Sequence, residues 1–302
     1  MTIAITGGTG FVGRSLIDLA LGQGHALRAL ARKPQAPRPG VEWVQGDLDD
    51  SAALARLSAG AGAVIHVAGL VNAADLADFE RCNVGGTAAV IAAAEAAGVP
   101  RLVFVSSLSA REPLLSAYGA SKLRAEELVR SSRLDWTIVQ PPAVYGPRDE
   151  ALFELFRAAT WGVVPTPKQG RASLIHVEDL ARLLLALVPG GEAVTHRLFE
   201  PDDGKPGGWD HAELARAIGE AVGRRPFVLG LSRGALQFAA RIDMALRGSK
   251  AKLTLDRASY FSHPDWAVSA AAAVPASVWQ PQVETREGLK ATAEWYRGQG
   301  WL

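Results

Sequence analysis

The sequence of 302 residues contains little cysteine, little methionine and almost no net charge. Its single cysteine, Cys82, excludes a disulfide within the chain and argues against a zinc site built from thiolates. The 32 lysines and arginines nearly balance the 31 aspartates and glutamates, so the net charge is +1. Such a chain has no strong overall field to hold nucleic acid, and we expect no nucleic-acid partner.

Long apolar runs are also missing. The longest uncharged stretches are interrupted by glycine, asparagine and proline, whereas a membrane-spanning helix needs about 20 predominantly apolar residues. The N-terminal sequence MTIAITGGTGFVGR lacks the basic region and long apolar stretch of a signal peptide. The six histidines do not have metal-ligand spacing, so we expect no metal site. These absences predict a cytoplasmic protein without a transmembrane segment.

The first half of the chain alternates short apolar or β-branched runs with longer helical patterns. The runs predict strands at residues 2–6, 26–31, 41–45, 63–67, 101–105 and 137–139. Helical composition and spacing fill the segments between them, at residues 11–21, 51–57, 85–97 and 117–130. This alternation predicts right-handed crossovers and a parallel sheet covered on both faces. The expected fold class is therefore α/β, with a doubly wound parallel sheet.

The second half has a looser pattern. A helix is expected at 150–160, and a strand at 173–177 with a helix at 178–188 is expected to return to the sheet. The stretch PDDGKPGG at 201–208 has the composition of a linker, and helical patterns follow at 211–222, 233–246 and 285–297. These patterns predict a first domain over residues 1–160, with 172–200 returning to it, and a smaller, mainly helical C-terminal substrate lobe over 201–302.

A glycine-rich turn, TGGTGFVG, lies where the first expected strand meets the first expected helix. Glycines at this spacing permit a tight turn and a close approach of the backbone to a pyrophosphate, and the helix N-terminus offers free N–H groups to the phosphates. The position of the motif predicts a dinucleotide-binding domain of the Rossmann type. We assign to cofactor binding Gly7, Thr9, Gly10, Phe11, Val12 and Gly13.

The end of the second expected strand bears on the choice of dinucleotide. Domains that bind NAD place an acidic residue about 20 residues beyond the glycines, but the sequence here is Leu-Ala-Arg-Lys, residues 30–33. The guanidinium of Arg32 suits a ribose 2′-phosphate, and Arg14 is a second candidate for the same group. We therefore expect NADP, with NAD left open.

A tyrosine and a lysine stand four residues apart, Tyr118 and Lys122, and so share one face of an expected helix. A neighbouring cation favours the phenolate form and lowers the pKa of a tyrosine from its ordinary value near 10. The pair can therefore exchange a proton with a carbonyl or alcohol oxygen. Two hydroxyls, Ser106 and Ser107, follow a central strand; we expect Ser106 to satisfy the backbone of the next turn and Ser107 to contact a substrate.

With these motifs in place, the sequence resembles the short-chain dehydrogenase/reductase superfamily, in its extended or closely related atypical branch. TGGTGFVG resembles the cofactor turn of the extended type, and the later segments follow in the family's order. These segments are QGDLDD at 45–50, HVAG at 66–69, NVGGT at 83–87, YGASK at 118–122, PPAVYGP at 141–147 and IHVEDL at 175–180.

The resemblance implies roles for particular residues. Tyr118 would be the general acid and base, Lys122 would hold the nicotinamide ribose and tune Tyr118, and Ser107 would orient the reacting oxygen. Asn83 would support the site. The cofactor contacts that the resemblance adds are Asp47, Leu48, Ala68, Gly69, Pro142 and Val144, together with Tyr118 and Lys122.

Departures from the family's nucleotide-sugar enzymes bear on the substrate. Gln140 and Ala143 stand where these enzymes usually carry arginine and asparagine, and Leu108 and Ser109 stand where dehydratases carry an Asp-Glu pair. A small or apolar ketone or secondary alcohol, as in the hydroxysteroid-dehydrogenase-like branch, therefore fits better. The alternatives are a nucleotide-sugar epimerase or dehydratase, and a non-catalytic NADP(H)-binding subunit or assembly protein.

Residues 227–246 alternate apolar side chains with arginines. The segment allows three interpretations: a helix on a membrane surface, a lid over an apolar substrate, or a helix packed on the core of the second lobe. We expect the third. The sequence leaves the oligomeric state open, a homodimer included.

Overall fold

The computed structural model describes residues 1–73, 75–248 and 251–302. The chain forms two compact units. The first comprises Met1–Gln140, Leu180–Glu200 and Val274–Gln280, and the second comprises Pro141–Asp179, Pro201–Ala273 and Pro281–Leu302.

The first unit is built on a parallel sheet of seven strands within the described residues. Its order is β11-β6-β5-β4-β1-β2-β3, so the chain turns outward in opposite directions on either side of the β1/β4 pair. Ligands of doubly wound sheets bind at such a switch point, beyond the carboxyl ends of the strands. The strands are β1 (Thr2–Thr6), β2 (Ala26–Ala31), β3 (Val41–Gln45), β4 (Ala63–His66), β5 (Arg101–Val105), β6 (Asp135–Val139) and β11 (Arg197–Phe199).

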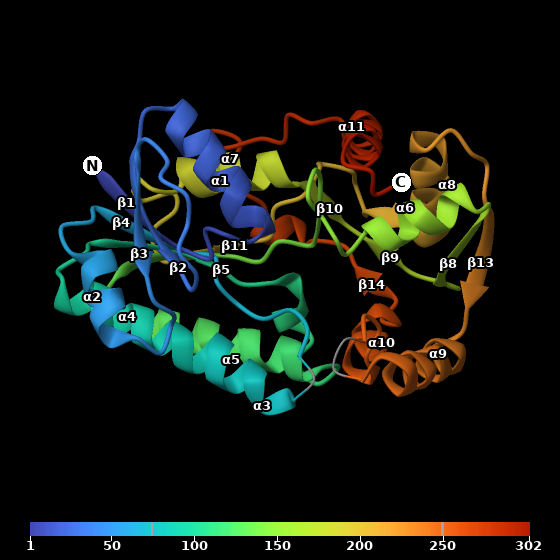
Figure 1. Ribbon diagram of the computed structural model, residues 1–302, viewed down its shortest axis with the longest axis horizontal. Helices are drawn as coiled ribbons and strands as arrows, with labels where there is room; N and C mark the ends of the chain where they lie inside the picture. Colours follow the sequence, from blue (N-terminus) through green and yellow to red (C-terminus); the bar gives the residue numbers. More distant parts are fainter. Residues whose placement is uncertain (74, 249–250) are drawn as a thin grey trace. The chain divides into compact units, whose positions relative to one another are not determined.

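Helices cover both faces of this sheet (Figure 1). One face carries α1 (Phe11–Gly22) and α7 (Val177–Ala186), most of which belongs to this unit. The other face carries α2 (Ser51–Ser58), α4 (Gly86–Ala96) and α5 (Ala117–Ser131). Because both faces are covered, the central strands β4 and β5 are buried at every position, which explains their mainly apolar composition.

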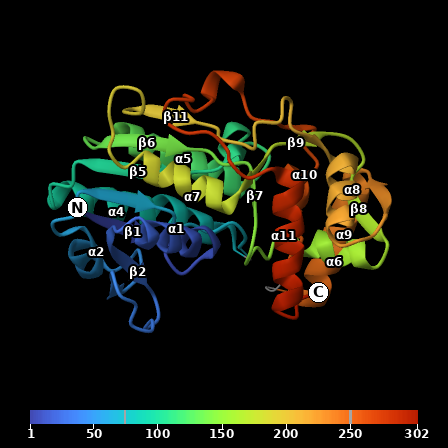
Figure 2. The same cartoon turned by 90° about the horizontal axis from the view of Figure 1, so that it is seen from above.

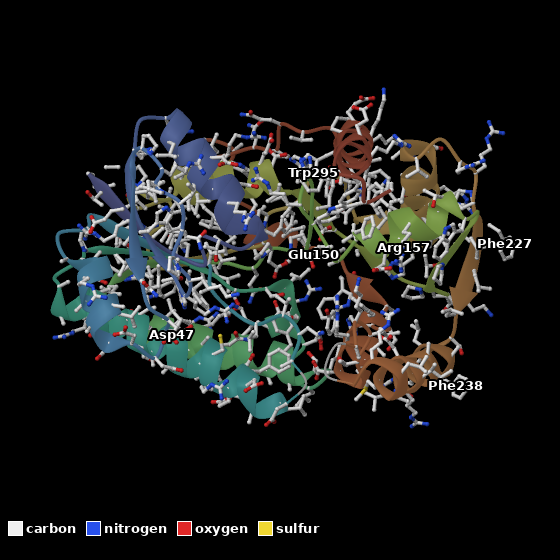
Figure 3. All side chains as sticks on the ribbon, viewed as in Figure 1. Asp47, Glu150, Arg157, Phe227, Phe238 and Trp295 are labelled. Atoms are coloured by element: carbon white, nitrogen blue, oxygen red, sulfur yellow. The ribbon has the colours of Figure 1, made fainter. Side chains whose placement is uncertain are left out.

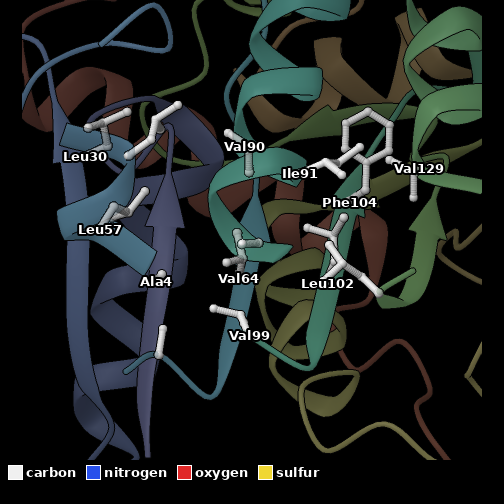
Figure 4. Packing of buried hydrophobic residues seen from close by; sticks show 14 of the residues in the cluster. Ala4, Leu30, Leu57, Val64, Val90, Ile91, Val99, Leu102, Phe104 and Val129 are labelled. Atoms are coloured by element: carbon white, nitrogen blue, oxygen red, sulfur yellow. The ribbon is translucent and has the colours of Figure 1, made fainter. Parts of the chain in front are cut away.

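The core between the sheet and α2, α4 and α5 is made of aliphatic side chains and one phenylalanine (Figure 4). Val64, Leu102 and Phe104 project from the strands toward Val90 and the neighbouring helical residues. Burial of this apolar area is the main force that holds the helices on the sheet. Three short elements connect the larger ones: α3 (Leu76–Phe79), the π-helical turn Glu80–Gly85 and the 3₁₀ turn Leu108–Arg111.

Within the described residues, the second unit contains three small sheets. β7 (Ala143–Tyr145) pairs in parallel with β10 (Leu174–His176), and β8 (Val163–Pro167) pairs in parallel with β13 (Phe227–Leu231). The third sheet has the order β12 (Trp209–Asp210), β9 (Arg171–Ala172) and β14 (Asp265–Trp266).

Three helices form the main core of the second unit: α6 (Phe153–Thr160), α8 (His211–Ala221) and α11 (Thr285–Gly298). Both α6 and α11 pack against α8, and Figure 2 shows α11 running beside it. The remaining helices, α9 (Arg233–Arg247) and α10 (Leu255–Phe261), pack on each other around a small separate cluster of Leu236, Ala240 and Ala258. A short 3₁₀ turn spans Ala270–Ala272.

The α/β class, the doubly wound parallel sheet and the smaller second unit expected from the sequence are confirmed. The strand expected to return to the sheet at 173–177 forms as β10, but it pairs with β7 in the second unit. The strand that joins the large sheet is β11, beside β6. Residues 141–160 and 172–179, expected in the first domain, lie in the second unit, because α6 and β10 contribute to its core.

The expectation for residues 227–246 is correct only in part. The segment begins with strand β13, and α9 follows from Arg233. Of the residues of α9, which all lie in the described part of the chain, Leu236 and Ala240 are buried, whereas Phe238 and Leu246 are 64% and 80% exposed. The helix is therefore not packed into the main core. Across residues 1–73, 75–248 and 251–302, no helix has the length and low charge that crossing a bilayer requires.

Candidate active site

The glycine turn forms as expected between β1 and α1. Gly7 has a φ of 73°, and a side chain there would place its Cβ 2.7 Å from the backbone nitrogen of Ala68. A Cβ on Gly13 would lie 2.1 Å from the carbonyl oxygen of Gly7. Among the described residues, no side chain caps α1 at Gly10, so its first N–H groups are available to an anion. The turn therefore requires glycine for shape and leaves a phosphate-binding helix end open.

Hydrogen bonds join this turn to the loop after β4. The backbone N–H of Ala68 donates to Thr6 Oγ1 at 3.2 Å, and Thr6 Oγ1 lies 2.5 Å from His66 Nδ1. On the other side of the ring, His66 Nε2 lies 3.1 Å from Thr87 Oγ1, whose hydroxyl donates to the carbonyl of Asn83 at 2.6 Å. Because the Thr87 hydroxyl hydrogen is used, His66 must donate from Nε2 and accept at Nδ1.

Burial keeps this histidine neutral. Desolvation, reinforced by the charge of Lys122, lowers the pKa of His66 to about 3. His66 therefore carries no charge in neutral solution and serves as a fixed hydrogen-bonded bridge between two loops. This is the structural role expected of a histidine at a strand end.

Asn83 fixes the same loop from the π-helical turn. Its Oδ1 accepts from the N–H of Leu70 at 2.7 Å, and its Nδ2 donates to the carbonyl of Leu70 at 3.0 Å. The same Nδ2 donates to Ser121 Oγ at 2.9 Å, which links the loop to α5. Asn83 thus acts as a support for the loop that contains Ala68 and Gly69.

Lys122 is buried on α5 and directed toward the end of β5. Its Nζ donates to the carbonyl oxygen of Val105 at 2.8 Å and lies 4.7 Å from the centre of the Phe104 ring. A Cβ built on Gly69 would lie 3.6 Å from the same Nζ, so the ammonium faces the loop after β4. Burial lowers the pKa of Lys122 to about 8, although the nearby Glu126 carboxylate raises it in part.

The start of α5, which contains Tyr118, packs on the 3₁₀ turn Leu108–Arg111, which Ser107 precedes. Gly119 makes this contact close, because a Cβ there would lie 2.5 Å from the carbonyl oxygen of Ser109. Ser116 caps α5 by accepting from the N–H of Gly119 at 2.9 Å. The ring of Tyr118 is buried and lies 5.9 Å from that of Phe79.

The hydroxyl oxygen of Ser107 accepts two hydrogen bonds from Ser109. The backbone N–H of Ser109 lies 3.2 Å from Ser107 Oγ, and the Ser109 hydroxyl donates to it at 2.9 Å. Since Oγ accepts both bonds and, among the described residues, donates none, the hydroxyl hydrogen of Ser107 is available to a further acceptor. Ser107 is half-buried, so part of the residue is exposed to solvent.

Ser106 does not bond to the following turn as expected. Its hydroxyl donates to the buried carboxylate of Glu126, which also accepts from Gln140 Nε2 at 2.7 Å and from Arg130 at 2.8 Å. Glu126 was not among the residues expected at the site. Its position one helical turn after Lys122 is the signal that could have identified it. The buried carboxylate ties β5, α5 and the end of β6 together.

The residues expected at the adenosine end of the cofactor lie on the surface. Arg32 is exposed and, within the described residues, makes no hydrogen bond or ion pair. Arg14 donates from Nε to the carbonyl of Thr9 at 2.9 Å, which holds it against the glycine turn. Asp47, labelled in Figure 3, is exposed and accepts from the N–H of Asp49, while Leu48 packs directly on Gly86.

Pro142 and Val144 fall in the second unit. Val144 belongs to β7 and is paired with Ile175 of β10. The structure therefore gathers within the first unit the expected cofactor turn, the loop after β4, Ser107, Tyr118 and Lys122, and assigns these two residues to the other unit. Among the described residues, no cluster of three or more histidine, cysteine or carboxylate side chains could hold a metal.

The donor set of the first unit fits a dinucleotide. It offers an uncapped helix end for the pyrophosphate and a buried ammonium beside the loop after β4. An exposed guanidinium stands at the end of β2. All three are groups that bind phosphate or ribose oxygens.

Comparisons with known proteins agree with this interpretation. Residues 7–189 match the NAD(P)H-binding family. The chain is 39% identical over 310 residues to the ceramide reductase of Caulobacter vibrioides, with 99% of this chain and 96% of that protein covered. It is 29% identical over 261 residues to a 3β-hydroxysteroid dehydrogenase/Δ5→4-isomerase of Mycobacterium tuberculosis, covering 74% of this chain and 70% of that one.

Among solved structures, MoeE5 in complex with UDP-glucose and NAD has the same fold, with a TM-score of 0.77 at 23% identity and 99% of each chain covered. The chain belongs to the NAD(P)H-binding extended short-chain dehydrogenase/reductase superfamily. It is an NAD(P)-dependent reductase of that superfamily.

Proposed function

We propose that this protein uses NADP(H) to interconvert a ketone and a secondary alcohol on an apolar substrate of the ceramide type. The observation that carries the substrate class is the similarity to ceramide reductase over the full length of both chains. The related hydroxysteroid dehydrogenase, also named for an apolar molecule, supports the same class.

Ser107, Tyr118 and Lys122 form the proposed catalytic set. The Ser107 hydroxyl, whose oxygen already accepts from Ser109, donates its hydrogen to the substrate carbonyl oxygen. The Tyr118 phenol donates the proton that this oxygen gains as the alcohol forms. A bound nicotinamide supplies the hydride that reduces the carbonyl carbon.

Lys122 supplies a positive charge in the proposed site. In the proposed mechanism its ammonium, anchored on the Val105 carbonyl, faces the cofactor ribose and favours the phenolate left on Tyr118. With a pKa near 8, Lys122 is charged at neutral pH and loses its charge at moderately alkaline pH. The neutral His66 bridge keeps the loop with Ala68 and Gly69 in place beside it.

Arg32 is the residue proposed to select NADP. It is exposed, and the segment at the end of β2 carries no carboxylate that could accept from a ribose 2′-hydroxyl. A guanidinium forms strong bidentate hydrogen bonds with phosphate, so it favours the phosphorylated ribose.

The alternative of a nucleotide-sugar epimerase has weaker support. Gln140, which replaces the arginine of those enzymes, is buried and engaged with Glu126. The similarity to nucleotide-sugar enzymes such as MoeE5 is below 25% identity and concerns the fold.

The deciding experiment follows absorbance of NADPH with purified protein and a set of ketones. The set contains the ketone counterpart of a ceramide, a 3-oxosteroid, a short water-soluble ketone and UDP-glucose. We expect NADPH oxidation with the ceramide-type ketone, loss of this activity in Tyr118→Phe, and weaker activity with NADH. Turnover of UDP-glucose with tightly retained NAD, and no reduction of any ketone, would contradict the proposal.

A further inference from the structure

An apolar surface is exposed on the second unit, along β8, β13 and α9. Its large side chains belong to the end of α6, to two paired strands and to one face of a helix. In Figure 3, Phe227 and Phe238 point outward from the ribbon of this unit. The members are Trp161, Val163, Pro165, Phe227, Leu229, Phe238, Ile242 and Leu246, and we call them the exposed apolar surface.

The strand part of this surface follows from the register of β8 and β13. Phe227 lies beside Val163 and Leu229 beside Pro165. Side chains alternate between the faces of a strand, and neighbours in a parallel pair share a face. Of the alternate residues of β8, Val164 and Thr166 are buried, so the opposite face, with Phe227 and Leu229, is turned to solvent.

The helical part is a second apolar face on α9. At about 100° per residue, Phe238, Ile242 and Leu246 fall on one arc of the helix, with small alanines between them. The buried residues Leu236 and Ala240 lie on a different side. A helix needs one apolar face to pack on its own unit, so α9 carries more apolar side chains than its packing uses.

The charges around the exposed apolar surface are almost all positive. Residues 223–248 contain five arginines and one aspartate, a net charge of +4 in a chain whose total is +1. The aspartate, Asp243, pairs with Arg247 and accepts from two backbone N–H groups. Arg224, Arg225, Arg233 and Arg241 are exposed. The surface therefore presents apolar side chains next to exposed guanidinium groups.

We propose that the exposed apolar surface docks the protein on a membrane that contains anionic phospholipid. A surface helix with an exposed apolar arc, which on α9 has Arg241 beside it, inserts its apolar side chains at the boundary of headgroups and acyl chains, while nearby arginines contact phosphates. A second copy of the chain is a poorer occupant, because a symmetric contact would bring the arginines of both copies together. This docking goes beyond the proposed reaction and does not depend on it.

The test is sedimentation of the full-length protein with phosphatidylcholine vesicles, with and without phosphatidylglycerol. We expect binding to the vesicles that contain phosphatidylglycerol and a loss of binding at high salt, since salt screens the arginine–phosphate attraction. Binding to both vesicle types alike, or to neither, would overturn the proposal.

Matched variants locate the contact. Ile242→Ser is expected to weaken binding about tenfold, because it removes one inserted aliphatic side chain. Met244→Ser is the control: Met244 lies on the same helix and is 40% exposed against 45% for Ile242, but is about 160° away around the axis. We expect it to bind as the unaltered protein does. Equal effects of the two substitutions would contradict the assigned face.

A second pair tests the charge. Arg241→Gln is expected to weaken binding about fivefold, and Arg133→Gln, an exposed arginine of the first unit, should have no effect. Sedimentation velocity without vesicles tests self-association, and a dimer lost in Ile242→Ser would overturn the proposal in favour of a second copy. Reduction of a soluble ketone should be unchanged in all four variants, so failure of docking and failure of the reaction are distinguishable.

Discussion

The sheet edge of the first unit and the exposed apolar surface of the second unit depart from ordinary protein structure in opposite ways. At the sheet edge, polar groups such as His66, Lys122 and Glu126 are buried. On the second unit, large apolar groups such as Phe227 and Phe238 are exposed. A stable fold avoids both arrangements where no function requires them.

The two regions also differ in whether these groups have partners within the protein: hydrogen bonds for the buried polar groups, and packing contacts for the exposed apolar groups. Glu126 accepts three side-chain hydrogen bonds, and His66 is bonded at both ring nitrogens. Burial of a polar group costs several kcal/mol unless such bonds form, and both His66 and Glu126 have them. The exposed apolar side chains of α9, Phe238, Ile242 and Leu246, belong to none of the buried clusters of the described residues. This contrast supports the proposed small-molecule site of the first unit and the proposed membrane contact of the second.

Removing the phenol hydroxyl tests the first region most strongly. Tyr118→Phe should lower kcat for ketone reduction by about 10²–10⁴-fold, because the proton donor is lost. Steady-state NADPH oxidation measures the change. Tyr260→Phe in α10, whose ring packs on Phe261 and Trp266, is the control and should keep its activity. A Tyr118→Phe protein with more than a tenth of the original kcat would remove Tyr118 from the proposed role.

The substitution Lys122→Met is expected to lower activity and to raise stability. It should reduce kcat by about 100-fold and yet raise the free energy of unfolding by about 1–3 kcal/mol, since a buried cation costs more than a methionine of similar length. Activity and urea unfolding measure the two effects. Lys205→Met, at a half-exposed ion pair with Glu213, should produce neither. Loss of activity together with loss of stability would show that Lys122 is mainly structural.

The cofactor end is tested by Arg32→Ala. If the guanidinium binds the 2′-phosphate, the ratio of NADPH to NADH affinity should fall by about 10–100-fold, the value of a charge-assisted hydrogen bond. Fluorescence titration with both cofactors gives the ratio, with Arg28→Ala on the same strand as the control, because Arg28 already pairs with Glu42. An unchanged ratio would contradict the assignment of Arg32.

The pH dependence follows from Lys122. Its ammonium is charged below a pKa of about 8, so ketone reduction should decline as the pH rises through 8. Stability should change in the opposite direction: between pH 8 and the ordinary value near 10.5 the unfolded chain holds the proton that the folded chain has released. The free energy of unfolding should therefore increase over that interval, and the increase should be absent in Lys122→Met.

The smallest expected effect is that of Ser109→Ala. The Ser109 hydroxyl donates to Ser107, and its removal frees Ser107 to turn away from a substrate oxygen. We expect kcat to fall about 2–10-fold with little change in KM, as one lost hydrogen bond implies. Ser131→Ala at the exposed end of α5 is the control. A fall larger than that of Ser107→Ala would mean that Ser109 itself contacts the substrate.

Much of the first unit could be predicted from the sequence because its signals are local. Short apolar or β-branched runs define β1, β2 and β3 with the bounds expected at 2–6, 26–31 and 41–45. The glycine turn was identifiable because only residues without a Cβ fit between Gly7, Gly13 and Ala68. A four-residue spacing likewise places Tyr118 and Lys122 on one helical face.

What the prediction missed depends on long-range contacts. Strand β10 has the composition of a sheet strand, but its partner β7 could not be read from residues 173–177. Ser106 and Glu126 are 20 residues apart and meet through the packing of α5 on β5. The exposure of α9 was also hidden, since its sequence is equally compatible with burial and with an interface.

The sequence by itself determined the order of strands and helices, the glycine turn, and the spacing of the tyrosine and the lysine, because backbone sterics and helical periodicity act between near neighbours. Only the tertiary structure decided that Ser107 keeps a free donor, that His66 is a neutral bridge, and that α9 presents a second apolar face to solvent. These properties arise from burial and from hydrogen bonds between segments far apart in the chain, and no local pattern encodes them.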